Sequence, residues 1–131
     1  MKRFFCLLMI SLVCMIVQAQ TFVCSDLNFY SSDLSQKEIQ DEKKRTLGSK
    51  AVLSVYDKYL KFVSTNNNGK SESYVLDKTN DSEYRYNEKT SYGYTYKMII
   101  KLQKIVNYIK GFTIDVYKDN RLQGSVTYKR D

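Results

Sequence analysis

The chain has 131 residues, of which 21 are basic and 14 acidic, and it contains no histidine, proline or tryptophan. The absence of histidine removes the usual general base and the commonest metal ligand, and we find no nucleophile-elbow or glycine-rich phosphate motif. We therefore expect no enzymatic activity, no metal site and no cofactor.

The first nineteen residues have the layout of a signal peptide. Lys2 and Arg3 form a basic start, residues 4–17 are almost all apolar, and Val17-Gln18-Ala19 precede a cleavage position before Gln20. We expect the mature chain to be secreted or periplasmic. Without the two leader cations its net charge falls from +7 to +5. This moderate charge permits an anionic surface as a partner but is typical of a solubilising surface.

Two alternatives to a cleaved leader remain. The apolar run is short for a membrane anchor, because a spanning helix needs about 20 apolar residues. Lipid attachment at Cys14 is disfavoured because Val13 is not the small residue that such sites need. We therefore predict a signal peptide over 1–19 and a single β domain over 20–131, a length that suits one domain.

The first predicted strand, Thr21–Tyr30, contains the only cysteine outside the leader, Cys24. An internal disulfide is thus excluded for the mature chain. A lone thiol in an oxidising compartment can pair between chains, but unpaired cysteines are among the most buried side chains. We favour a core position for Cys24 and keep assembly through it as an alternative.

A polar helix is predicted next, over Gln36–Thr46, with a charged loop as the alternative. Ser35 and Glu38 have the spacing of a capping box, and Gly48 is a suitable helix stop.

The rest of the chain reads as short strands separated by turn residues, among which Asn66-Asn67-Asn68-Gly69 is the clearest turn. The predicted strands are Ala51–Tyr56, Tyr59–Ser64, Ser71–Asp77, Glu83–Asn87, Thr95–Leu102, Phe112–Lys118 and Leu122–Arg130.

Tyrosines are concentrated between residues 84 and 96. Residues two apart in a strand share a face, so we expect Tyr86 opposite Tyr92 or Tyr94 to form an aromatic ladder that continues the core face. Such a ladder is either structural or the wall of a ligand site at a barrel mouth. The candidate ligand-binding residues are Tyr84, Tyr86, Tyr92, Tyr94 and Tyr96.

The segment 97–110 fits two structures. As a strand, Met98, Ile100 and Leu102 face the core and the lysines face water. As a helix, the same segment is amphipathic and basic, which would suit an anionic membrane surface. We favour the strand, with residues 104–110 as a turn, helical turn or short strand. The candidate interaction residues are Lys97, Lys101, Lys104 and Cys24.

Tyr74-Val75-Leu76-Asp77 and the closing segment Gly111-Phe112-Thr113-Ile114-Asp115-Val116-Tyr117 resemble small exported bacterial β proteins of unknown function. The resemblance implies an antiparallel barrel or sandwich and export across the inner membrane. It supplies no site residues.

The sequence therefore predicts an all-β fold, a single antiparallel barrel or sandwich of about six to eight strands with at most one short helix. The alternative is an α+β fold with a helix near 97–110. For function we expect a non-enzymatic binding module whose ligand is a small apolar molecule or a glycan. The alternatives are an interaction protein that assembles through sheet edges or Cys24, and a basic protein on a membrane surface. We do not expect nucleic acid as a partner.

Overall fold

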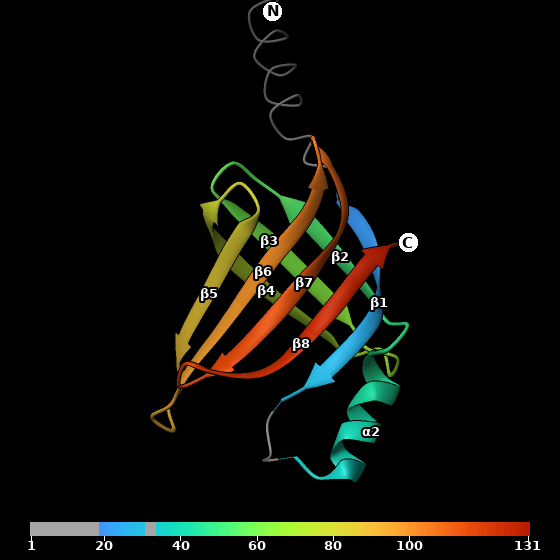
Figure 1. Ribbon diagram of the computed structural model, residues 1–131, viewed down its shortest axis with the longest axis vertical. Coiled ribbons are helices and arrows are strands. Elements are labelled where there is room, and N and C mark those ends of the chain that lie inside the picture. The colour runs from blue at the N-terminus through green and yellow to red at the C-terminus, as the bar shows by residue number, and fades with distance from the viewer. Residues whose placement is uncertain (1–18, 31–33) are drawn as a thin grey trace, which may run out of the picture.

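The computed structural model describes residues 19–30 and 34–131, and these form a closed antiparallel barrel of eight strands with one helix (Figure 1). Each strand pairs with its neighbours in chain order, and β8 closes the barrel onto β1. The signal peptide prediction falls on residues that are almost all outside the described ranges. The elements are β1 (Gln20–Phe29), α2 (Gln36–Thr46), β2 (Lys50–Val55), β3 (Tyr59–Thr65), β4 (Ser71–Asn80), β5 (Glu83–Lys89), β6 (Thr95–Ile105), β7 (Tyr108–Lys118) and β8 (Arg121–Arg130).

The all-β prediction is confirmed, and all eight predicted strands are present. The inner and outer faces of the barrel follow from the alternation of side chains, because every second side chain of a strand points into the barrel. On β6, Met98, Ile100 and Leu102 are buried while Lys101 between them is exposed. The alternative helix near 97–110 does not form. Strands β6 and β7 instead meet at the tight turn Val106-Asn107.

One half of the barrel is filled by large apolar side chains. Phe22 of β1 packs edge to face on Phe112 of β7, with ring centroids 5.0 Å apart. Burying side chains of this size stabilises the fold by roughly 1.5–3 kcal/mol each. The largest fully buried residues are Phe22, Leu53, Leu60, Leu76, Tyr84, Ile100 and Phe112. We call this half, which contains the β6–β7 turn, the packed end.

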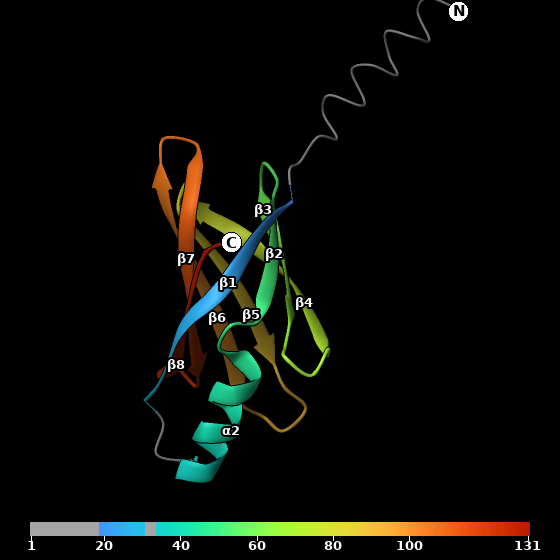
Figure 2. The same ribbon diagram turned by 90° about the vertical axis from the view of Figure 1, so that its right-hand side faces the viewer.

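Helix α2 lies at the opposite end of the barrel from the β6–β7 turn (Figure 2). Its bounds match the prediction, and Ser35 caps the N-terminus, because the Glu38 amide donates to Ser35 Oγ at 3.2 Å. Gly48 follows with φ +79°, a conformation that glycine adopts without strain. None of the helix residues is buried.

The C-terminal turn of α2 is fastened to the β3–β4 loop by one residue, Asn67. Its side-chain amide donates to the carbonyl oxygens of Lys44 and Leu47, at 2.8 and 2.9 Å, and its backbone amide donates to Arg45 O at 2.8 Å. Carbonyl groups at the C-terminal end of a helix have no hydrogen-bond donor within the helix itself. Asn67 therefore fixes where the helix sits against the barrel. No helix among residues 19–30 and 34–131 is both long enough and apolar enough to cross a bilayer.

The barrel wall is incomplete between β4 and β5. Their pairing runs only from Asp77 with Arg85 to Asn80 with Glu83, next to the packed end. The remainder of β4, Ser71–Leu76, pairs with β3 but has no partner on β5. The two strands therefore separate toward the end at which α2 lies.

Candidate functional site

A cavity of about 780 Å³ occupies the half of the barrel opposite the packed end. Its inner wall is made by apolar and aromatic side chains from six strands: Leu27, Phe62, Tyr74, Tyr96, Met98, Ile114, Val116, Val126 and Tyr128. Charged side chains stand at its rim, namely Glu42, Arg45, Lys70, Glu72 and Lys118. The mouth is bounded by α2, the β3–β4 loop, the β5–β6 loop and the start of β8.

The cavity exists because small residues take inward positions in this half. On β3, the buried Leu60 and Phe62 are followed two positions later by Ser64. On β8, Gly124 lines the cavity and packs so closely on β1 that an added Cβ would meet Asn28 O at 2.8 Å. Eight-stranded barrels have an interior just wide enough for side chains to fill, or for one small ligand. Here side chains fill the packed end, and the other half is left open as the cavity.

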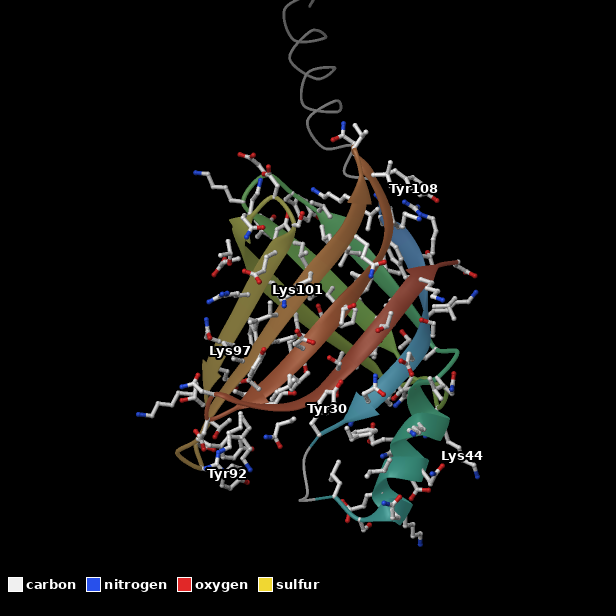
Figure 3. All side chains as sticks on the ribbon, in the orientation of Figure 1. Tyr30, Lys44, Tyr92, Lys97, Lys101 and Tyr108 are labelled. Carbon is white, nitrogen blue, oxygen red and sulfur yellow. The ribbon has the colours of Figure 1, made fainter. Side chains whose placement is uncertain are left out.

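The structure places the five candidate tyrosines in different surroundings. Tyr94 and Tyr96 line the cavity. Tyr84 lies in the packed end with 1% of its surface exposed, and Tyr92 is 86% exposed in the β5–β6 loop (Figure 3). Tyr86 is half-buried and packs against the core without lining the cavity. The structure therefore brings only two of the five to the cavity wall.

The expected ladder of Tyr86 with Tyr92 or Tyr94 is wrong. The residue opposite Tyr86 is Met98. Residues 90–94 form the loop between β5 and β6, so Tyr92 and Tyr94 lie in this loop and not on a strand opposite Tyr86. Tyr86 instead meets Tyr74 of β4 edge to face, with ring centroids 5.4 Å apart and planes at 70°. The aromatic contact thus spans the part of the wall where β4 and β5 do not pair.

The tyrosines beside the mouth lie in a negative local environment. The Tyr74 hydroxyl donates to Glu72 at 3.2 Å, and the Tyr86 hydroxyl donates to Glu88 at 2.9 Å. Burial, followed by the Glu72 charge, raises the pKa of Tyr74 to about 12, and the same two causes raise the pKa of Tyr96. Both phenols therefore stay protonated at neutral pH. The Tyr74 proton is already donated to Glu72, so Tyr96 is the one of the two that can donate a hydrogen bond to another group in the cavity.

The cations at the mouth lie on other elements. The Lys118 ammonium of β7 sits 4.4 Å from the centroid of the Tyr94 ring, a favourable cation–π distance. Arg45 of α2 forms an ion pair with Glu42 one helical turn before it. The rim therefore has both signs of charge around an apolar interior.

The three lysines proposed as interaction residues lie outside the cavity. Lys97 and Lys101 project from the outer wall (Figure 3). The Lys97 ammonium stands 4.7 Å from the Tyr117 ring centroid, and Lys101 lies 3.6 Å from the Asp115 carboxylate. Lys104 donates to the backbone oxygen of Asp81 at 2.7 Å. These lysines do not form a helical stripe.

Cys24 is buried, with 3% of its surface exposed. Its thiol lies 3.6 Å from Asp26 O, and burial raises its pKa. Because the side chain faces the barrel interior beside Tyr128, an inter-chain disulfide would require the wall to open.

Sequence reasoning missed part of the cavity. Phe62 and Tyr74 could have been found from the alternation of their strands, since they share parity with the buried Leu60 and Leu76. Nothing in the sequence indicated that α2 borders the cavity, because its charged residues are typical of a solvent-exposed helix. Within the described ranges no group of three His, Cys, Asp or Glu side chains is placed to hold a metal ion.

Comparison of the chain with protein-family models, curated proteins and solved structures finds no match. The geometry of the cavity is therefore the basis for a functional proposal.

Proposed function

We propose that this protein is a non-enzymatic binding protein of the secretory or periplasmic space that holds one small amphipathic molecule in the open half of the barrel. The observation that carries the proposal is the division of the interior into a packed end and a cavity of about 780 Å³. Ligand pockets in proteins have volumes of about 300–1,000 Å³ and mostly apolar walls with a few polar groups.

The chemistry of the wall supports a ligand with an apolar body. Met98, Ile114 and Val126 line the inner part of the cavity, where burial of apolar surface gives roughly 25 cal/mol per Å². The polar part of the ligand would lie at the rim, within reach of the Tyr96 hydroxyl and the charges of Glu72 and Lys118. A flat sugar platform is less well supported, because the ring of Tyr96 belongs to the interior rather than to an outer face.

The first test fills the cavity. Val116 lines it, whereas Val75 lies on the outer wall of β4 with 53% of its surface exposed. The same substitution, Val→Trp, at each position provides a matched pair. We expect Val116→Trp to weaken binding of the fluorescent probe 1-anilinonaphthalene-8-sulfonate by at least about tenfold, equivalent to 1.4 kcal/mol. Val75→Trp should bind it like the unmodified protein.

Native mass spectrometry of protein recovered from its own compartment identifies the bound molecule directly. Equal probe binding by both tryptophan variants, each still folded by circular dichroism, would show that the cavity is not the binding site. A protein that retains no small molecule and binds no probe would contradict the proposed function as a whole.

A further inference from the structure

The tip of the β6–β7 hairpin exposes apolar side chains at the packed end of the barrel. Ile105, Val106 and Tyr108 are 56%, 86% and 52% exposed. Ile105 and Tyr108 are paired across the hairpin, and Val106 lies in the turn that joins them, so the three side chains are adjacent. Contiguous exposed apolar groups mark an interaction surface more often than single exposed residues do.

The backbone at this tip holds Val106 in an unfavourable conformation. Val106 has φ +57°, in the left-handed region that a β-branched residue rarely adopts. Holding a residue there costs on the order of 1–3 kcal/mol, and such strain is concentrated at functional positions. A turn optimised for stability alone would have glycine or asparagine at this position.

Basic side chains flank the apolar tip. Lys104 precedes Ile105 and is exposed, and Lys110 is exposed on the other strand of the hairpin. The Arg130 guanidinium lies 4.4 Å from the Tyr108 ring centroid. Aliphatic side chains with a tyrosine and adjacent cations are the composition that the interface of an anionic bilayer favours, because tyrosine prefers the headgroup level and lysines bind the lipid phosphates.

Arg130 also connects the hairpin to the first strand. It donates to Gln20 Oε1 of β1 at 2.6 Å and to Ile109 O of β7 at 3.1 Å.

We propose that the β6–β7 tip is a membrane-contact site, in which Ile105, Val106 and Tyr108 enter the headgroup region of an anionic bilayer. Lys104 and Lys110 contact the lipid phosphates. This inference uses no property of the cavity and is therefore independent of the proposed function.

Tryptophan scanning tests the contact, because the unmodified chain contains no tryptophan. Val106→Trp and Val75→Trp each introduce a single tryptophan, the first at the tip and the second on the outer wall. Each purified protein, with its N-terminus determined by mass spectrometry, is mixed with vesicles of phosphatidylcholine alone or with about one third phosphatidylglycerol. We expect blue-shifted emission and quenching by brominated acyl chains only for Val106→Trp, and mainly in the anionic vesicles.

Two further variants separate a membrane role from a structural one. Val106→Gly relieves the strained φ, so it should raise thermal stability while lowering the fraction bound to vesicles. Lys110→Gln should lower the partition coefficient into anionic vesicles by about fivefold, which is the effect of about 1 kcal/mol per basic residue.

Equal emission from the two tryptophan variants in vesicles would overturn the proposal, as would unchanged vesicle binding by Val106→Gly. Concentration-dependent burial of the tip tryptophan without vesicles, together with a larger size in solution, would assign the tip to contact between copies and would also overturn it.

Discussion

Tyr74 and Tyr86 meet edge to face across the part of the barrel wall where β4 and β5 do not pair. Each hydroxyl donates to a glutamate two residues away on its own strand, Glu72 or Glu88, so neither of these hydrogen bonds joins the strands. The ring contact therefore closes this section of the wall next to the cavity.

Replacement of Tyr74 by alanine should lower the free energy of unfolding by about 2–4 kcal/mol, since it removes a half-buried ring and an aromatic pair. Chemical denaturation measures the change. The matched control is Tyr92→Ala, whose ring is 86% exposed and which should stay within about 0.5 kcal/mol of the unmodified protein. Equal losses for the two variants would show that the ring contact does not support the wall.

The position of α2 should depend on Asn67. In Asn67→Ala the side-chain hydrogen bonds to the carbonyl oxygens of Lys44 and Leu47 are lost. We expect faster amide hydrogen exchange in α2, with a stability loss of about 1–2 kcal/mol and no change in the exchange of β6 and β7. Asn68→Ala, one position later in the same loop, is the control. Unchanged exchange in α2 would contradict the fastening role of Asn67.

Stability should fall at alkaline pH. The folded-state pKa of Cys24 is raised from 9.0, and that of Tyr74 is raised from 10.0 to about 12, with burial as the first cause of both. Above the unfolded pKa the unfolded chain loses these protons while the folded chain keeps them, so folding is progressively disfavoured. We expect the loss to begin near pH 9 and to continue to about pH 12.

Denaturation at fixed pH steps measures this loss, and Tyr74→Phe provides its control. The phenylalanine keeps the ring but removes one titrating group, so the fall between pH 10 and 12 should become shallower. An identical pH profile would mean that the Tyr74 hydroxyl is not protected in the fold.

Gly124 should tolerate no side chain. The Cβ of Gly124→Ala would lie 2.8 Å from Asn28 O on β1, and a backbone atom cannot move aside as a side-chain end can. We expect a loss of about 1–3 kcal/mol and a lower affinity for an apolar probe, because β8 must shift at the cavity wall. Lys129→Ala, at an exposed position on the opposite face of β8, is the stability control. Equal stabilities of Gly124→Ala and the unmodified protein would show that β8 can move without cost.

Alternation of apolar residues predicted the eight strands, because a strand with one buried face repeats every two residues. The bounds were less exact, since β6 continues to Ile105 and β7 begins at Tyr108 rather than at Phe112. Helix α2 was predicted from Ser35, Glu38 and Gly48. The hydrogen bond between Ser35 and Glu38 and the positive φ of Gly48 are local effects, which depend only on residues close in the chain. The ladder of Tyr86 with Tyr92 or Tyr94 failed for the opposite reason. Strand register depends on the length of the loop between the strands, and residues 90–94 left that length open.

The sequence by itself determined the strands, the helix and the inward parity of Met98, Ile100 and Leu102, since these follow from neighbouring residues and from the pleat. Only the tertiary structure decided that the barrel closes through β1 and β8, that Tyr74 meets Tyr86 where two strands separate, and that Ser64 and Gly124 leave a cavity at one end. These features require residues far apart in the chain to meet, and no local pattern specifies which distant side chains share one volume.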